Sequence, residues 1–220
     1  MKKYAIKLVY DTDAESPREW DNLGTITAEH RRYDFSDTDS IPIERFEDIV
    51  SKKTSDYLYL PVYLYDHSGV SLSTSPFSCP WDSGQVGYIY VSKDNIRKEY
   101  GVKRISPKLK LSVYELLRQE ISIYSQYING EVYGFQIAEI GNEYIQDNYP
   151  VMSKCWEKQY NKLSMKEKSK FIVDNFFKDT VCLEGFPSQK IVDGCYGYYD
   201  KGDAIHDAID NFNSIFLNEG

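Results

Sequence analysis

The sequence predicts an α+β fold, in which a mostly antiparallel sheet is packed with several helices and the chain carries a helical insertion. The sequence contains more short β-rich segments than a simple alternation of strands and helices would give. Turn-forming Gly, Pro, Asp and Ser residues join some of these segments directly. Amphipathic segments with helix-capping residues at their ends lie between others. With 220 residues, of which 41% are hydrophobic, the chain can bury a substantial core.

The first half of the chain is expected to contain most of the strands. Tyr57–Tyr65 is apolar at nearly every position, which indicates a strand buried on both faces, so Pro61 within it must lie at a bulge or an edge. Apolar residues recur at helical spacing over Ile43–Lys53, and a helix is expected there with Pro42 at its first position. The other predicted strands of this half have a β-favouring composition or alternation: Tyr4–Tyr10, Gly24–Tyr33, Val70–Thr74 and Gln85–Val91.

Local signals place two helices in the middle of the chain. Ser92 can cap a short helix that runs to Tyr100 and is closed by Gly101. A longer helix begins at Ser106–Pro107 and ends at Asn129–Gly130. Its apolar residues have the spacing of a helix that packs on a core: Leu109, Val113, Leu116, Leu117, Ile121, Tyr124 and Ile128.

Two strands and a helix are expected nearer the C-terminus. The strands are Glu131–Ile140 and Ile191–Tyr199, and the helix begins at Gly202. Both strands combine glycine with aromatic residues, a composition typical of close backbone approach and cross-strand aromatic packing. We therefore predict that the two strands are neighbours in the sheet.

The segment between these two strands differs in character from the rest of the chain. Residues 142–190 are predicted to hold two helices, Met152–Leu163 and Met165–Lys178, the second begun by a capping box. The predicted organisation is an α+β core over 1–141, a helical insertion over 142–190, and a C-terminal strand and helix over 191–220 that complete the core.

The charge of the chain limits its partners. A formal net charge of −8 argues against direct binding of nucleic acid through its phosphates and against an anionic membrane surface. It is compatible with a basic protein partner, including a nucleic-acid-binding protein. The N-terminal residues contain no long apolar run, no segment is long enough to span a membrane, and no Cys-x-x-Cys pair occurs. The expected location is the cytoplasm, with free thiols.

The segment Leu60–Val91 is the most distinctive part of the sequence. Two apolar strands flank a stretch rich in Ser, Pro and Gly, and two turns, Asp66–Gly69 and Trp81–Gly84, explain most of that composition. The functional alternative is that these turns gather reactive side chains at one end of a sheet. The candidate residues in the stretch are Asp66, His67, Ser68, Cys79, Trp81 and Asp82.

His67 is the leading candidate for proton transfer, because imidazole titrates close to neutral pH. Asp66 and Asp82 could orient it or bear a compensating charge. Ser78 or Cys79 could supply a nucleophile, although no helix-terminus signal lies beside Cys79 to activate the thiol. The structural alternative, in which these are ordinary turn residues, remains open.

A second group of candidates lies on the strand predicted at Gly24–Tyr33. Alternation along that strand would place His30 and Arg32 on one face and Arg31 on the other. If the first face met the 66–82 loops, His30 and His67 with nearby aspartates could bind a divalent metal. Arg31 or Arg32 could instead grip a phosphate or carboxylate, or form surface salt bridges.

Common catalytic and nucleotide-binding motifs are absent from the sequence. It contains no G-x-x-x-x-G-K-[ST], no G-x-G-x-x-G, no G-x-S-x-G and no H-E-x-x-H. These absences exclude several common architectures but not enzymes in general. No cofactor and no metal is predicted.

Several motifs together resemble a family of small accessory proteins of bacteriophages and mobile elements. The resemblance covers Trp20–Ile140 and resumes at Asp193–Tyr199, and relative to shorter members residues 142–190 look like an insertion. The motifs that carry it are Arg18–Thr25, His30–Tyr33, Tyr63–Gly69, Pro76–Gly87 and Tyr133–Phe135.

The resemblance implies a biological setting, and no catalytic residue is carried over from it. It implies a phage or mobile-element protein that acts in the bacterial host cell, where it binds and inhibits a host protein of anti-phage defence without catalysis. A defence factor that binds nucleic acid is one such partner. The alternative is an enzyme or a small-ligand or metal binder that acts through His30, Asp66, His67 and Asp82. A virion or assembly component is a third possibility.

Overall fold

The computed structural model describes residues 4–52, 56–67, 69–139 and 191–218, with Glu167 and Ser188. The predicted helices within 142–190 lie outside these ranges. The described chain has two antiparallel sheets with helices packed on them, which confirms the α+β prediction. Within the described ranges, every helix falls short of the length and apolarity needed to cross a lipid bilayer.

The chain forms two compact units whose boundaries differ from the predicted ones. One unit contains residues 1–14 and 130–220, and the other contains residues 15–129. The sequence predicted a single core over 1–141 that 191–220 would complete. Instead, the N-terminal strand and the strand after residue 130 belong to a sheet of their own.

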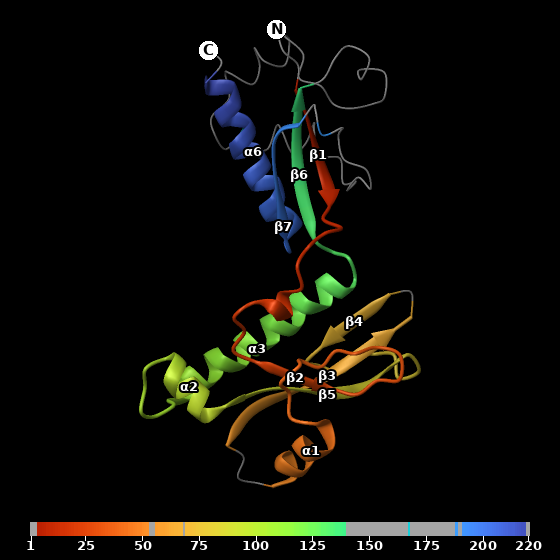
Figure 1. Ribbon diagram of the computed structural model, residues 1–220, viewed down its shortest axis with the longest axis vertical. Helices are drawn as coiled ribbons and strands as arrows, with labels where there is room; N and C mark the ends of the chain where they lie inside the picture. Colours follow the sequence, from red (N-terminus) through yellow and green to blue (C-terminus); the bar gives the residue numbers. More distant parts are fainter. Residues whose placement is uncertain are drawn as a thin grey trace. The chain divides into compact units, whose positions relative to one another are not determined.

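The first unit is a three-stranded sheet with one described helix against it. β1 (Tyr4–Tyr10), β6 (Tyr133–Glu139) and β7 (Ile191–Tyr198) pair in that order, and all pairs are antiparallel. α6 (Lys201–Asn218) packs on the sheet (Figure 1). Its buried residues Ala204, Ala208 and Phe212 meet Phe135 of β6.

The predicted pairing of the two glycine-aromatic strands is confirmed. The Phe135 and Tyr198 rings of β6 and β7 lie 6.1 Å apart. A Cβ on Gly134 would lie 2.4 Å from the Tyr196 ring. Only glycine lets this ring lie over β6.

The second unit is a four-stranded sheet between two helical layers. Its strands are β2 (Thr25–Ala28), β3 (Tyr57–Asp66), β4 (Val70–Ser73) and β5 (Ser83–Ser92), and their order across the sheet is β2-β5-β3-β4. Figure 1 shows α3 on one face and α1 on the other. The helical elements of this unit are the short 3₁₀ helix η1 (Pro17–Glu19), α1 (Ile43–Ser51), α2 (Lys93–Glu99) and α3 (Pro107–Ile128).

The capping signals of α2 and α3 act as predicted. The Ser92 hydroxyl accepts from the Asn95 N–H at 3.0 Å, and the Ser106 hydroxyl accepts from the Leu109 N–H at 3.1 Å. After each helix, Gly101 and Gly130 take positive φ angles of 62° and 70°. Glycine adopts this conformation without the steric cost that other residues incur.

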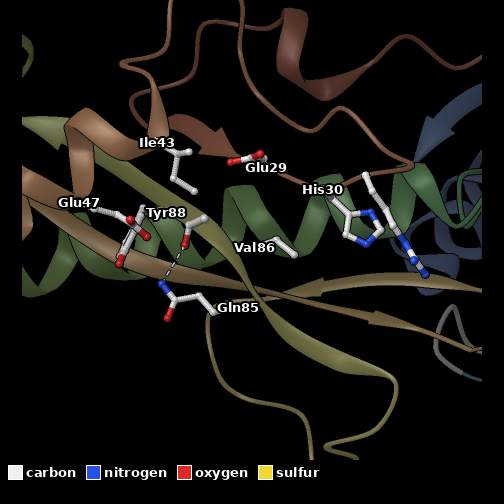
Figure 2. Close-up of a pocket in the computed structure, with 9 residues that line it drawn as sticks. Glu29, His30, Ile43, Glu47, Gln85, Val86 and Tyr88 are labelled. Atoms are coloured by element: carbon white, nitrogen blue, oxygen red, sulfur yellow. Dashed lines mark hydrogen bonds between the residues drawn. The ribbon is translucent and has the colours of Figure 1, made fainter.

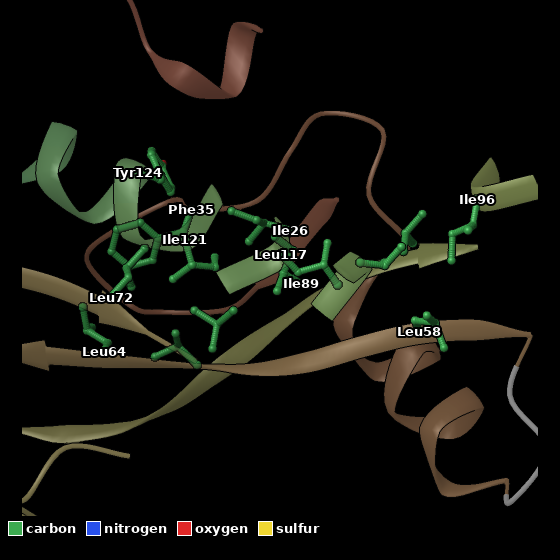
Figure 3. Close-up of a cluster of buried hydrophobic side chains, with 14 residues drawn as sticks. Ile26, Phe35, Leu58, Leu64, Leu72, Ile89, Ile96, Leu117, Ile121 and Tyr124 are labelled. Atoms are coloured by element: carbon green, nitrogen blue, oxygen red, sulfur yellow. The ribbon is translucent and has the colours of Figure 1, made fainter. Parts of the chain in front are cut away.

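The main core lies between α3 and the sheet. Figure 3 shows Leu117, Ile121 and Tyr124 of α3 facing Ile26, Leu64 and other strand residues. The predicted apolar stripe of α3 therefore does face the sheet. Leu116 is only partly buried, however, and Glu120 takes a buried place in the stripe instead.

The opposite face of the sheet carries tyrosines, and it corrects the prediction for β3. This strand is not buried on both faces, because buried and half-buried residues alternate along most of it. Pro61 lies where β3 has only β5 beside it, one residue before the register shift between Val62 and Tyr63. The prediction of a bulge or edge for this proline is thus confirmed.

Phe46 of α1 anchors that helix on the tyrosine-rich face. It is fully buried, and its ring centroid lies 4.4 Å from that of Tyr90 and within 6 Å of three other tyrosine rings. α1 thereby covers the part of this face that carries the cluster. The residues of the cluster are Phe46, Tyr57, Tyr59, Tyr88 and Tyr90.

A buried ionic network that the sequence did not reveal joins η1 and the loop after β2 to α3. The Arg18 guanidinium forms two bonds with Asp37, at 3.0 and 2.6 Å, and one with Glu120 at 3.2 Å. Glu120 also accepts from the backbone N–H groups of Leu23 and Gly24. Burial alone would lower the pKa of Arg18, but the bonds to the two carboxylates raise it.

Candidate functional site

The end of the β3–β4 hairpin and the loop from β4 to β5 meet at one end of the sheet. The N–H of Asp66 donates to the carbonyl of Asp82 at 2.9 Å, which ties the two turns together. The hydroxyl of Ser83 donates to the Cys79 carbonyl and closes the second turn. The turn predicted at Asp66–Gly69 joins β3 to β4, as expected. The second turn ends earlier than the predicted Trp81–Gly84, because Ser83 and Gly84 already belong to β5. The two turns lie side by side. We call this region, His67 with residues 74–82, the hairpin tip.

The Asp82 carboxylate organises the side chains of the hairpin tip. Its Oδ2 lies 3.2 Å from His67 Nδ1 and 3.7 Å from Cys79 Sγ. In a nucleophile–base–acid relay the imidazole lies between thiol and carboxylate. Here the carboxylate is shared by both groups, an arrangement that braces a turn and does not set the imidazole to take the thiol proton.

The strand that carries His30, Arg31 and Arg32 is shorter than predicted. Ser36 and Asp37 fold back and take the outer hydrogen bonds of β2, with the Asp37 carboxylate 2.8 Å from the Ile26 N–H. The chain must therefore turn directly after Ala28, where β2 ends. The predicted placing of His30 and Arg32 on one strand face and Arg31 on the other is wrong for this reason.

Arg32 nevertheless joins this loop to the hairpin tip. Its guanidinium forms an ion pair with the Asp66 carboxylate, and it also lies 5.3 Å from the centre of the Tyr33 ring. The metal hypothesis required the His30–Arg32 segment to meet the 66–82 loops, and the two are in contact through the Arg32–Asp66 pair. About half of the Arg32 side chain stays exposed, so the pair orients the loop more than it stabilises the fold.

His30 takes part in a row of rings instead of facing His67. It stacks on Tyr33 with ring centres 5.2 Å apart, and Tyr33 stacks on Phe35 at 5.5 Å. Phe35 in turn packs edge-on against Tyr124 of the core. His30 is therefore positioned by a stack that ends in the core of the unit.

A cleft of about 590 Å³ lies between α1 and the sheet next to this loop. Figure 2 shows His30 at one end and Glu47 with Tyr88 at the other, while Gln85 donates from its side chain to the Gly87 carbonyl. The cleft carries charged groups of both signs and little apolar wall. Its lining residues are Glu29, His30, Arg31, Ile43, Glu47, Gln85, Val86, Gly87 and Tyr88.

The metal hypothesis is not supported by this geometry. Within the described ranges, no group of three or more His, Cys, Asp or Glu side chains is arranged to hold a metal ion. Asp66 is engaged by Arg32, and of the four proposed ligands only His67 and Asp82 contact each other through their side chains. Ser68 lies outside the described residues.

Trp81 is the most exposed large side chain of the hairpin tip. It is 92% accessible, although it directly precedes Asp82, whose backbone and side chain are both bonded. Burial of an indole removes a large apolar area from contact with water. Tryptophan is enriched among the residues that contribute most to binding at protein interfaces, so this exposed indole on a braced turn is a candidate contact residue for a partner.

The uncovered part of the tyrosine-rich sheet face adjoins the hairpin tip, and sequence reasoning missed it as a surface. Tyr63 pairs with Ser73 and Tyr65 with Ser71, so all four side chains share one face. The Phe77 ring packs at 5.5 Å on Tyr65, and all five side chains are partly accessible. The strict Tyr alternation of YLYLPVYLY was the available signal. We call this set, Tyr63, Tyr65, Ser71, Ser73 and Phe77, the Tyr-Ser face.

Comparison with protein-family models, with curated proteins and with solved structures gives no match. The function of the chain is therefore inferred from its own residues and their arrangement.

Proposed function

We propose that this chain is a non-catalytic binding protein that recognises a protein partner through the hairpin tip and the Tyr-Ser face. The observation that carries the proposal is the exposure of Trp81 on a turn that hydrogen bonds hold in place. Tryptophan, tyrosine and arginine dominate the binding energy of protein interfaces. All three residue types occur at this end of the sheet, as Trp81, Tyr65 and Arg32.

The bracing of the turn favours binding on physical grounds. Association costs free energy for every side chain or loop that has to be ordered. The contacts of Asp82 with His67, Cys79 and the Asp66 backbone hold the turn before a partner arrives. Trp81 can then be buried by a partner with a smaller loss of conformational entropy.

The composition of the Tyr-Ser face also supports a protein partner. Tyrosine supplies a large and rigid contact area with few rotatable bonds, and serine supplies adaptable hydrogen bonds, a combination typical of binding loops in antibodies. The two pairs Tyr63–Ser73 and Tyr65–Ser71 repeat this combination side by side. The Phe77 ring, which packs on Tyr65, links these pairs to the hairpin tip.

The nature of the partner rests on the resemblance and on charge. Phage accessory proteins act inside a bacterial host, so we propose a host protein of anti-phage defence as the partner, inhibited by binding. The chain has a net charge of −8, which favours association with a basic surface such as that of a nucleic-acid-binding protein.

Affinity capture tests this proposal. The full chain, immobilised through a terminal tag, is incubated with nuclease-treated lysates of several bacterial hosts. The proposal expects one host protein in a near-stoichiometric amount and loss of that protein's activity when the chain is added. Recovery of no stoichiometric partner from any host would refute it.

A further inference from the structure

The segment Lys93–Lys110 has a charge opposite to that of the whole chain. It contains seven basic residues and two acidic ones, a net charge of +5 in a protein of net charge −8. One of the seven, Arg97, is paired with Asp94 at 2.5 Å. The exposed cations of the segment are Lys98, Lys103, Arg104, Lys108 and Lys110, here called the basic tract.

The corner between α2 and α3 carries the basic tract. α2 ends at Glu99, Gly101 turns the chain with its positive φ, and α3 begins at Pro107 (Figure 1). The tract thus spans the last turn of one helix, a short loop and the first turn of the next. The first turn of α3 also contributes the positive end of the helix dipole.

A cleft of about 470 Å³ adjoins the basic tract at Lys98. Trp20 and Tyr100 line it, and both are exposed, at 47% and 40%. Leu23, Leu116 and Ile123 add apolar wall, and Asn22 and Asn95 add side-chain amides. The cleft therefore combines aromatic faces, hydrogen-bonding edges and a neighbouring cation.

We propose that the corner between α2 and α3 binds single-stranded nucleic acid, with a base in the Trp20–Tyr100 cleft and the phosphates along the basic tract. Proteins that bind single strands combine aromatic side chains, on which bases stack, with cations that follow the backbone. Both parts are present here, and Lys98 of the tract also lines the cleft. The net charge of −8 is a sum over the whole chain, so it does not reveal this locally basic tract.

The acidic residues of the cleft fit this arrangement. Glu120 is buried and satisfied by Arg18 and by the Leu23 and Gly24 N–H groups. Asp21 and Glu99 also line the cleft, so it repels phosphates and admits the uncharged base. The phosphates are then directed to the tract, where lysines offer the point charges that suit a flexible backbone.

Fluorescence anisotropy with a labelled 20-nucleotide oligothymidylate tests the proposal on the full chain. Binding is expected at 50 mM salt and should weaken roughly 100-fold at 200 mM, as about five phosphate contacts on a single strand imply. The double variant Lys103→Glu/Arg104→Glu should lose at least tenfold in affinity. The double variant Arg45→Glu/Lys52→Glu, on α1 and directly after it, changes the net charge equally and should bind nearly as the natural chain does.

Tyr100→Ala separates stacking from charge. It should weaken binding about tenfold without changing the salt dependence, because base stacking carries no counterion release. Absence of binding at 50 mM salt, or an equal loss in the two charge variants, would overturn the proposal. So would binding of anionic lipid vesicles or of an acidic peptide in place of the oligonucleotide.

Discussion

The backbone N–H of Asp66 donates to the carbonyl of Asp82 at 2.9 Å, which joins the end of β3 to the start of β5 through two neighbouring turns. Because this bond joins backbone groups, it leaves the side chains of both residues available for other contacts. Asp66 uses its carboxylate to hold Arg32, and Asp82 uses its carboxylate to hold His67 and Cys79. The two aspartates thus connect Arg32, His67 and Cys79. Of the other sequence-predicted candidates, His30, Arg31 and Trp81 take no part in these contacts, and Ser68 lies outside the described residues.

Asp82→Ala is expected to loosen the hairpin tip without unfolding the protein. The substitution removes the side-chain acceptor for His67 and Cys79 and keeps the backbone carbonyl that receives the Asp66 N–H. Because the His67 contact is exposed, the free energy of unfolding should fall by less than about 1 kcal/mol. Amide hydrogen exchange over residues 76–84 should become faster. Asp39→Ala, in the exposed loop before α1, is the control and should leave that exchange unchanged.

Arg31→Ala and Arg32→Ala are expected to differ although the residues are adjacent. Arg32 pairs with Asp66, so its loss should release the loop after β2 and raise hydrogen exchange over residues 29–33. Arg31 lines the wide cleft, and its loss should leave exchange in that loop near the natural rate. Equal exchange in the two variants would show that the Arg32–Asp66 pair does not position the loop.

Phe46→Ala is expected to be strongly destabilising. Phe46 is the one fully buried side chain of α1 and packs on a cluster of tyrosine rings. Removal of this buried ring should lower the free energy of unfolding by roughly 3–5 kcal/mol. Denaturant unfolding followed by tyrosine and tryptophan fluorescence measures the change. Arg45→Ala on the exposed side of the helix should cost little, and a similarly small loss for Phe46→Ala would contradict the assigned packing.

Glu120 should give the protein a characteristic dependence on pH. Burial raises the pKa of its carboxyl above the ordinary value of 4.5, against the opposing effect of the Gly24 N–H and Arg18. The folded state therefore binds this proton more tightly than the unfolded state does. The contribution of Glu120 to stability is present at low pH and is lost as the pH rises from about 4.5 through the raised pKa.

The variant Glu120→Gln isolates that contribution. The amide resembles the protonated carboxyl and does not titrate, so the stability of the natural chain relative to the variant should decrease as the pH rises through this window. Unfolding by denaturant at a series of pH values measures the difference. A difference that increases with pH would mean that Arg18 and the backbone donors outweigh the cost of burial.

Local signals in the sequence were sufficient for most of the elements. Ser92 and Ser106 each cap a helix through their own side chains, and Gly101 and Gly130 close those helices through their own backbone freedom. Such signals depend only on neighbouring residues, so a single sequence reveals them. The hairpin turn at Asp66–Gly69 was predictable for the same reason.

The features that sequence reasoning missed depend on residues far apart in the chain. β2 ends at Ala28 because Ser36 and Asp37 fold back on it, and no local signal at residue 28 announces this. Arg18 and Glu120 lie 102 positions apart, so their pairing was not visible. Glu120 can take a buried place in the apolar stripe of α3 because its carboxylate is bonded by Arg18, Leu23 and Gly24, which are all distant in the sequence. The hairpin tip could be anticipated because its parts lie close together in the sequence.

The binding of a host protein through Trp81 is tested most directly by capture with matched tryptophan variants. The natural chain, Trp81→Ala and Trp20→Ala are immobilised separately and exposed to the same nuclease-treated bacterial lysates. Both tryptophans are exposed, at 92% and 47%, and Trp20 lines the cleft beside α2, whose lining does not include Trp81. The natural chain and Trp20→Ala are predicted to retain one stoichiometric host protein that Trp81→Ala loses. Equal retention by Trp81→Ala, or no stoichiometric partner for the natural chain, would contradict the proposal.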